Sequence, residues 1–268
     1  MSASLLLVGC GKMGGAMLAG WKAAGAAGAV VVVEPFGAPK GLPSDVLVVK
    51  EATEIPSDFA PDAVILAVKP QMMDQALPFY ARYAGSALFL SIAAGKPISY
   101  FEKHLGAGAA IVRAMPNTPA AVGRGISAAV PNANASEKQK TLARTLLSAV
   151  GEVAWVADET LLDAVTALSG SGPAYVFLLV ETIAKAGAAA GLPPDLAMQL
   201  ARATVMGSGE LLRQSHESAE QLRRNVTSPK GTTEAALNVL MQEGPGGMQD
   251  LLTRAIATAT ARSRELAG

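Results

Sequence analysis

The stretch Leu5-Leu6-Leu7-Val8-Gly9-Cys10-Gly11-Lys12-Met13-Gly14 decides the fold, because it has the pattern of a dinucleotide-binding loop. An apolar run typical of a buried strand leads into three glycines with the spacing G-x-G-x-x-G, and a helical pattern follows. Gly9 permits a tight turn, Gly11 lets the backbone approach a pyrophosphate, and Gly14 lets the helix lie close to the strand. Loops of this composition also occur as ordinary tight turns. The flanking strand and helix favour a dinucleotide site whose phosphates face the helix start.

The composition excludes several classes of partner. The 268 residues include 22 Lys and Arg and 22 Asp and Glu, so no net field attracts nucleic acid or an anionic membrane. The most apolar stretch, residues 164–180, is interrupted by Ser169-Gly170-Ser171-Gly172-Pro173, and no unbroken apolar run approaches the roughly 18 residues of a membrane span. The apolar segment at the amino terminus has no basic region before it. We therefore expect a soluble, cytoplasmic protein with no nucleic-acid or membrane partner.

Cysteine and histidine are too few for a disulfide or a metal centre. The single cysteine, Cys10, cannot form an internal disulfide, and the two histidines, His104 and His216, lie far apart in the sequence. We expect no bound metal, and Cys10 is interpreted as a small apolar residue of the loop.

The alternation of apolar runs and helical patterns predicts an α/β domain with a doubly wound sheet over residues 1–157. Strands are expected at 30–34, 63–68, 87–92, 110–115, 125–130 and 152–156, in addition to the first, with helices at 13–25, 70–84 and 97–104. After Asp158 the strand pattern stops, and helices are expected at 159–168, 173–190, 194–213, 216–224, 232–242 and 247–266. The second domain, residues 158–268, is predicted to be all helical.

The expected helix at 173–190 is apolar around most of its circumference, with Val176, Phe177, Leu178, Leu179 and Ile183 among its residues. Such a helix must be covered on nearly all sides. A helical domain of about 110 residues can barely bury it alone, so we expect a second subunit to cover it. The alternative is a central core helix within one monomer.

Two further segments have residues suited to binding small anions. Lys69 follows a predicted strand, at the edge where open α/β sheets bind ligands, although a solvated loop lysine is the alternative. The segment Val226-Thr227-Ser228-Pro229-Lys230-Gly231-Thr232-Thr233-Glu234 opens a helix with hydroxyls and free amides, which suit a small carboxylate. An ordinary helix cap explains the same residues equally well.

Five blocks along the chain carry a resemblance to a known enzyme family. The sequence resembles pyrroline-5-carboxylate reductase, the last enzyme of proline biosynthesis, over essentially its whole length. The blocks are residues 9–14, Ala67-Val68-Lys69-Pro70, Arg113-Ala114-Met115-Pro116-Asn117-Thr118-Pro119-Ala120, Leu168-Ser169-Gly170-Ser171-Gly172-Pro173-Ala174-Tyr175 and Ser228-Pro229-Lys230-Gly231-Thr232-Thr233. The resemblance implies a Rossmann-like domain, followed by a helical dimerisation and substrate domain that interlocks with its partner's in a homodimer or a ring of dimers.

The chemistry implied by the resemblance is hydride transfer from NADPH or NADH to the cyclic imine 1-pyrroline-5-carboxylate, giving L-proline. Substrate-binding residues carried over from the family are Ser228, Gly231, Thr232 and Thr233, which hold the carboxylate. The Thr233 hydroxyl also contacts the ring nitrogen, which makes Thr233 the catalytic residue. The resemblance further implies that Glu159 lines the same pocket. Alternatively, Glu159 has only a structural role, as a carboxylate that the positive end of its own helix stabilises.

The resemblance also implies where the cofactor is held. Lys69 and Asn225 contact it, the backbone of residues 93–95 follows a strand beside it, and residues 115–119 form the loop next to the nicotinamide. The complete set of predicted cofactor-binding residues is Gly9, Cys10, Gly11, Lys12, Met13, Gly14, Glu34, Ala67, Val68, Lys69, Ala93, Ala94, Gly95, Met115, Asn117 and Asn225.

Lys230 departs from the family pattern, because the family has glycine as the third residue of Ser-Pro-Gly-Gly-Thr-Thr. A left-handed backbone at this position would be strained with lysine, so the loop is expected to differ locally.

Glu34 bears on the form of the cofactor. It lies 25 positions after Gly9, where dinucleotide folds place the residue that meets the adenosine ribose. A carboxylate there accepts ribose hydroxyls and repels a 2′-phosphate, which favours NADH. Two alternatives stay open: Glu34 ends its strand facing solvent, or Lys40 lies close enough to bind a phosphate.

Two other classes of function share several of these features. A hydroxyacid or imine reductase would have the same glycine loop and helical tail, with a lysine base in the helical domain. A nucleotide-binding regulator or carrier would bind the dinucleotide without turnover.

Overall fold

The computed structural model describes residues 2–37 and 41–267, and it divides the chain into two compact units. The first unit comprises Met1–Ser171 together with Ala259–Gly268, and the second comprises Gly172–Thr258. Lys40 lies outside the described residues.

The first unit contains one eight-stranded sheet with the order β3-β2-β1-β4-β5-β6-β7-β8. Its strands are β1 (Ala3–Val8), β2 (Ala27–Val33), β3 (Val46–Val49), β4 (Ala63–Leu66), β5 (Leu88–Ser91), β6 (Ala110–Met115), β7 (Gly125–Pro131) and β8 (Gly151–Trp155). Neighbouring strands are parallel except β6 and β7. The short link between β6 and β7 explains this exception, because a parallel connection needs a crossover of about a dozen residues or more.

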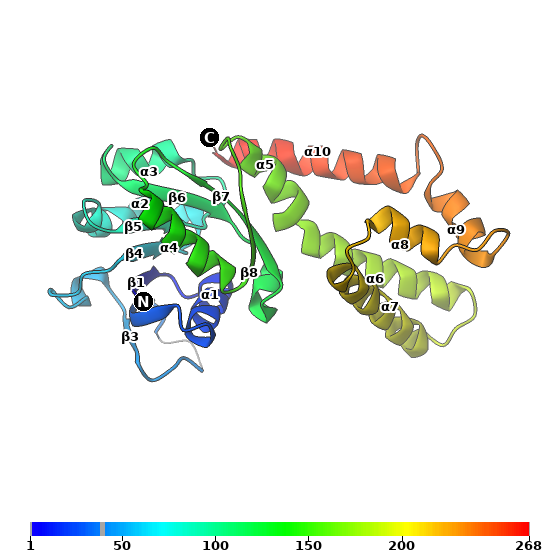
Figure 1. Cartoon of the computed structure of the whole chain (residues 1–268), viewed down its shortest axis with the longest axis horizontal. Coiled ribbons are helices and arrows are strands. Elements are labelled where there is room, and N and C mark those ends of the chain that lie inside the picture. Colours follow the sequence, from blue (N-terminus) through cyan, green and yellow to red (C-terminus); the bar gives the residue numbers. More distant parts are fainter. Residues whose placement is uncertain (1, 38–40, 268) are drawn as a thin grey trace. The chain divides into compact units, whose positions relative to one another are not determined.

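Helices cover both faces of the sheet, as the sequence predicts for a doubly wound fold (Figure 1). On one face, α1 (Lys12–Ala23) and α4 (Glu137–Ser148) contribute Met17, Trp21 and Leu147 to a core with Leu5 and Leu7. On the other face lie α2 (Met73–Ala76) and α3 (Ile98–Leu105), and the described part of the unit also contains four 3₁₀ segments: Ala52–Glu54, Pro70–Met72, Leu77–Tyr83 and Thr118–Val122. The prediction of the fold class is therefore confirmed.

Two elements of this unit were absent from the sequence prediction. Strand β3 is only four residues long and lies at the edge of the sheet, so its apolar run is short. Helix α4 begins at a capping box in which Ser136 and Gln139 bond reciprocally. That Ser-x-x-Gln pattern is the signal that predicts the start of the helix.

The helices of the second half follow the predicted order closely. They are α5 (Leu161–Val165), α6 (Gly172–Ala189), α7 (Pro194–Gln214), α8 (Ala219–Asn225), α9 (Thr232–Leu240) and α10 (Met248–Ala267). One expectation is wrong: Ser169-Gly170-Ser171-Gly172 does not interrupt the helix, because residues Thr166–Gly170 form a π turn that joins α5 to α6. The resulting helix, Leu161–Ala189, contains an 18-residue window with a mean hydropathy of 1.3, and among the described residues it meets the length and composition of a membrane span.

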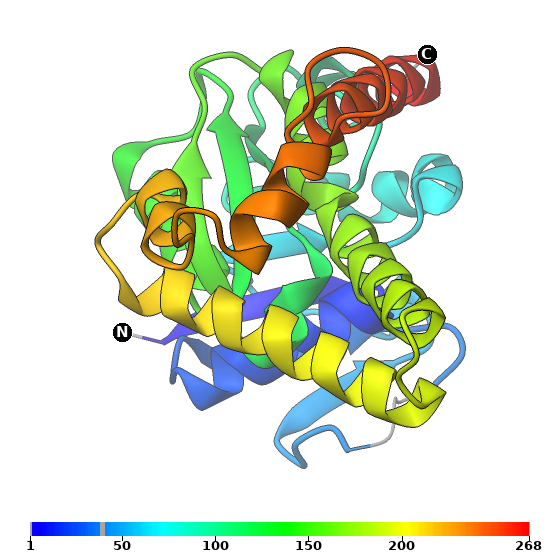
Figure 2. The same ribbon diagram turned by 90° about the vertical axis from the view of Figure 1, so that its right-hand side faces the viewer.

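Helix α6 has a large exposed apolar surface. It packs against α7, and Figure 2 shows the two helices with the loop that joins them. Phe177 is 63% exposed and Leu178 is 56% exposed, and Ala184 alone among the described residues of α6 is buried. The alternative of a core helix covered within one monomer is therefore wrong, and the apolar surface of α6 is available to another chain.

Candidate active site

The glycine loop has the geometry of a phosphate cradle. Gly9 has a φ of +89°, and a Cβ there would lie 2.9 Å from Val68 Cγ1. A Cβ on Gly14 would overlap the carbonyl oxygen of Gly9, so glycine is required for the close approach of α1 to β1. A Cβ on Gly11 would meet nothing within 4 Å, and α1 begins at Lys12 without a side-chain cap. The loop therefore leaves open space at Gly11, in front of the helix start, where a pyrophosphate fits.

A cavity of about 650 Å³ adjoins this loop at the carboxyl ends of β1, β2 and β4. Six of the predicted cofactor residues line it: Gly9, Gly11, Glu34, Ala67, Val68 and Lys69. In the sheet, β1 lies between β2 on one side and β4 on the other, so the strand order changes direction at β1. Doubly wound sheets bind ligands at such a switch point. Its size and position suit the adenosine half of a dinucleotide.

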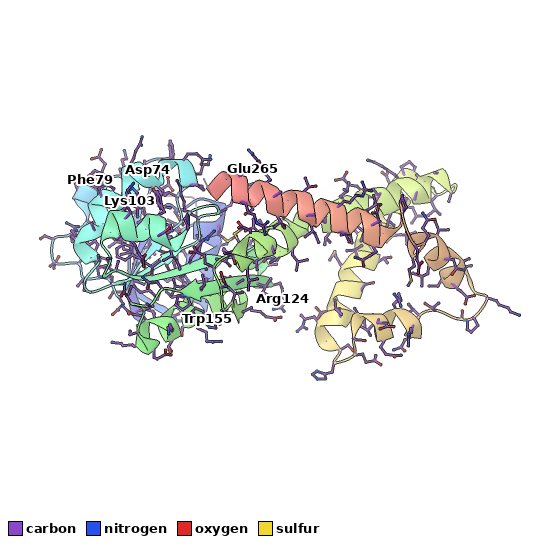
Figure 3. The ribbon with its side chains drawn as sticks, turned by 90° about the horizontal axis from the view of Figure 1, so that it is seen from above. Asp74, Phe79, Lys103, Arg124, Trp155 and Glu265 are labelled. Atoms are coloured by element: carbon purple, nitrogen blue, oxygen red, sulfur yellow. The ribbon has the colours of Figure 1, made fainter. Side chains whose placement is uncertain are left out.

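Sequence reasoning missed several residues of this cavity. Phe36 is 91% exposed at its wall, and Phe79, labelled in Figure 3, is 56% exposed. Lys50, Thr53 and Met72 also line it. These residues follow different strands and share no motif, so only the folded sheet brings them together. Exposed aromatic rings in a concave site are suited to covering a flat heterocycle.

Glu34 faces the glycine loop rather than solvent. Its carboxylate accepts the backbone N–H of Cys10 at 2.7 Å and that of Phe36 at 3.4 Å. Burial, together with this nearby carboxylate, raises the pKa of the Cys10 thiol. The carboxylate is thus held at the cavity wall by the loop itself, where the sequence predicts a ribose-binding acid.

The other predicted residues of the loop, Cys10, Lys12, Met13 and Gly14, are not part of the cavity lining. Cys10 is 5% exposed and belongs to the core on the α1 face, and Met13 packs against the same core. Contacts of Cys10, Lys12 and Met13 with a cofactor would therefore be made through the backbone at the start of α1.

A second cavity, of about 450 Å³, lies beside the loop that follows β5. Ala94 and Gly95 line it together with Lys96 and Arg262, whereas Ala93 is buried in the core below the loop. Both cations have partners of their own: Lys96 Nζ lies 4.3 Å from the centre of the Tyr100 ring, and Arg262 Nη1 lies 2.7 Å from Glu265 Oε2.

Glu159 has two close partners within the first unit. Its Oε1 accepts the backbone N–H of Ile98 at 2.8 Å and pairs with Arg113 Nη1 at 2.6 Å. The Arg113 side chain is only 8% exposed. Both contacts use Oε1, and the prediction that Glu159 lines the substrate pocket stays a prediction.

The side chains of Met115 and Asn117 contact the π turn. A Cβ on Gly170 would lie 2.6 Å from Met115 Cε, so Met115 packs directly over that glycine. Asn117 Nδ2 donates to the Ser169 carbonyl at 3.3 Å, and its Oδ1 accepts the N–H of Ile126 at 2.9 Å. Cofactor contact by either residue stays a prediction.

In the second unit, the predicted substrate loop precedes α9 directly. Lys230 has a φ of +57°, so this lysine adopts the left-handed conformation that the sequence identifies as strained, and a difference from the family's loop stays a prediction. The Lys230 N–H donates to Glu234 Oε2 at 2.7 Å. A Cβ on Gly231 would lie 2.5 Å from Ser228 Oγ, so a larger residue here would displace the Ser228 hydroxyl. Helix α9 begins at Thr232 without a side-chain cap.

Asn225, at the end of α8, is held by its own helix and the preceding turn. Its Oδ1 accepts Gln221 Nε2 at 2.7 Å, and its Nδ2 donates to Glu217 Oε2 at 3.1 Å. The predicted contact of Asn225 with the cofactor is untested. Among residues 2–37 and 41–267, no group of three His, Cys, Asp or Glu side chains is arranged to hold a metal ion.

Comparison with known proteins identifies the family. A family model described as pyrroline-5-carboxylate reductase dimerisation matches residues 159–266. The chain is 38% identical over 268 residues to pyrroline-5-carboxylate reductase from Pseudomonas aeruginosa, with 98% of this chain and 96% of that protein covered. The chain belongs to the pyrroline-5-carboxylate reductase family. The resemblance inferred from the sequence motifs is thereby confirmed.

Two solved pyrroline-5-carboxylate reductases have the same fold over their full length. The structure from Coxiella burnetii is 32% identical, with a TM-score of 0.88 and complete coverage of both chains. The Plasmodium falciparum enzyme, solved with NADP bound, is 28% identical, with a TM-score of 0.83 and coverage of 99% and 98%. The dimerisation model of this family matches residues 159–266, so α6, with its exposed apolar surface, lies within the matched region.

Proposed function

We propose that this protein is a pyrroline-5-carboxylate reductase, which reduces 1-pyrroline-5-carboxylate to L-proline in the last step of proline biosynthesis. The observation that carries the proposal is the 38% identity to an enzyme of that name across 98% of the chain. The glycine loop and its adjoining cavity support an oxidoreductase that uses NADH or NADPH.

The glycine loop and the adjoining cavity of the first unit are suited to binding the cofactor. Free amides at the start of α1 would bind the pyrophosphate, and the open side of Gly11 would admit it. Glu34 would bind the ribose and Phe36 would cover the adenine. When bound, the reduced nicotinamide would supply the hydride, and the protein would orient the imine toward it.

The cofactor form that we propose is NADH, with NADPH also usable. The support is the position of Glu34, whose carboxylate is held in the cavity by the Cys10 N–H. A 2′-phosphate at this wall would meet a negative charge, whereas ribose hydroxyls would donate to it. Lys50 and Lys69 line the same cavity, and either cation would offset part of the repulsion.

The loop before α9 is the proposed substrate site. Amides of Gly231, Thr232 and Thr233, with the Ser228 hydroxyl, would bind the substrate carboxylate at the positive end of the helix. The Thr233 hydroxyl would hydrogen-bond to the ring nitrogen. The imine would enter already protonated, because none of these groups is a strong acid.

We propose a homodimer, or a ring of dimers, in the cytoplasm. The support is the match of residues 159–266 to a dimerisation model and the exposed apolar surface of α6. In this arrangement the helical domain of one subunit would complete the active site of another.

The deciding experiment follows nicotinamide absorbance after 1-pyrroline-5-carboxylate is added to the purified protein and NADH or NADPH. Oxidation with formation of proline is expected. Oxidation with only a 2-keto acid or an unrelated imine would indicate another reductase of similar architecture. Tight cofactor binding without turnover on any of these substrates would indicate a regulator or carrier.

A further inference from the structure

Three alternate residues of β6 and its extension contact the segment 159–170, which runs from the turn before α5 through the π turn. Arg113, Met115 and Asn117 follow each other at a spacing of two, so their side chains leave β6 and its extension on the same face. Arg113 pairs with Glu159, Met115 packs over Gly170, and Asn117 donates to Ser169. All six residues lie in the first unit. We call this set of three contacts the docking seam.

The docking seam also reaches the neighbouring loops of the sheet edge. Glu159 accepts the N–H of Ile98, which starts α3 directly after the loop that carries Ala94 and Gly95. Arg113 lies opposite Ser91 in the pairing of β6 with β5, and Ser91 Oγ accepts the N–H of Ala93. The loops after β5 and β6 are thus fixed to one another and to the helical segment.

The polar contacts of the seam are partly buried, with Arg113 the most deeply buried of their side chains. Glu159 Oε1 accepts two hydrogen bonds at 2.8 and 2.6 Å, one of them from a guanidinium that is nearly inaccessible to water. Asn117 uses both ends of its amide, because Oδ1 binds Ile126 at the start of β7 and Nδ2 binds Ser169. Loss of Glu159 would leave the buried Arg113 guanidinium without its carboxylate, which favours a single arrangement of the loops.

We infer that the docking seam positions the carboxyl-edge loops of β5 and β6, and thereby the nicotinamide end of the cofactor. In this reading Arg113, Glu159, Asn117 and Ser169 are positioning residues that act through the backbone of these loops. The inference rests on the proposed function for its effect on hydride transfer, but the docking itself is testable without activity. A displacement of about 1 Å at the reacting centre can lower a rate on the order of 10²-fold, so a small shift of these loops would be measurable.

Native-state hydrogen exchange tests the docking directly. Glu159→Ala removes the acceptor of the Ile98 amide, so exchange at Ile98 should become at least about tenfold faster. The matched control is Ser136→Ala at the start of α4, where Ser136 Oγ accepts the N–H of Gln139. The control should speed exchange at Gln139 and leave Ile98 unchanged. Unchanged exchange at Ile98 in Glu159→Ala would overturn the docking.

Kinetics with the holoenzyme test the consequence. Glu159→Ala should lower kcat on the order of tenfold or more, while the Kd for NADH and the KM for pyrroline-5-carboxylate change less than about threefold. Glu159→Gln keeps an oxygen acceptor for Ile98 and Arg113 and should recover most of the rate. A raised KM in both variants would instead make Glu159 a substrate contact and overturn its positioning role.

The two arms separate this inference from the proposed function. A wild-type protein that never oxidises NADH with pyrroline-5-carboxylate would refute the proposed function, and the exchange measurement would still decide whether the seam docks the loops. An active wild type whose Asn117→Ala and Glu159→Ala variants keep full kcat would refute the positioning role alone.

Discussion

Glu34 is the single residue that bears most directly on cofactor choice, because its carboxylate is fixed at the cavity wall by the Cys10 N–H. Glu34→Ser should shift the ratio of kcat/KM values toward NADPH by roughly tenfold, or about 1.4 kcal/mol, since the repulsion of a 2′-phosphate is removed. The measurement is kcat/KM with each cofactor for both proteins. A strong wild-type preference for NADPH that the substitution leaves unchanged would show that Glu34 does not meet the ribose.

Thr233 is expected to act on the substrate and not on the cofactor. Thr233→Val keeps the shape and removes one hydroxyl, so kcat/KM should fall on the order of 10²-fold while the Kd for NADH stays constant. Thr232→Val is the matched control, because the predicted contact of Thr232 is through its backbone amide. Equal losses in the two variants would argue against a hydroxyl contact from Thr233.

Lys230 adopts a left-handed backbone that glycine would adopt at less cost. Lys230→Gly should therefore raise the free energy of unfolding by about 0.5–1 kcal/mol, and Lys230→Ala should give no such gain. Thermal or denaturant unfolding of the three proteins makes the comparison. A gain in the alanine variant as large as in the glycine variant would assign the effect to the lysine side chain instead of the backbone.

Residues of the site were predictable from sequence only where a motif fixes them in space. The glycine spacing located Gly9, Gly11 and Gly14, and the end of the second strand located Glu34. Phe36 and Phe79 could not be found in this way, because they meet only when separate loops converge on one cavity. The pairing of Glu159 with Arg113 spans 46 positions, and no local pattern indicates it.

Among the elements, the contact between α1 and the end of α4 depends on a helical glycine. A Cβ on Gly20 would overlap Val150 Cγ1 and lie 2.8 Å from the Ala149 carbonyl oxygen. Gly20→Ala should therefore destabilise the protein by about 1–3 kcal/mol, despite the better helix propensity of alanine. At Gly15, on the same helix, an added Cβ would lie 3.9 Å from the nearest atom, the Cys10 carbonyl oxygen. Gly15→Ala should therefore be neutral or stabilising. Chemical denaturation should separate the two variants, and equal effects would contradict the packing argument.

At the element scale, the sequence predicted most helices within a few residues because their apolar periodicity is strong. It missed β3, whose four residues are too few to show a period, and it read Ser169–Gly172 as a break. Serine and glycine favour turns in isolation. Here the π turn keeps the helix continuous, because packing of Met115 over Gly170 and the bond from Asn117 stabilise it.

For the whole molecule, the exposed face of α6 predicts association. Leu179→Asp should weaken the dimer, because a carboxylate would be buried in the apolar interface, and light scattering should report a lower mass. The wild type should have at least twice the chain mass of 27.2 kDa. Leu47→Asp, at an exposed leucine of β3, is the control that should leave the mass unchanged. An active wild-type monomer at micromolar concentration would refute both the interface and the shared active site.

The exposed apolar helix makes stability a property of concentration as well as of sequence. If a partner chain covers α6, folding and association are linked by mass action, and the melting temperature rises with the amount of protein present. Dilution would then lower the activity, since a dissociated chain exposes the apolar surface of α6 to water and loses the neighbour that completes its active site. Newly made chains would become enzymes only after they meet.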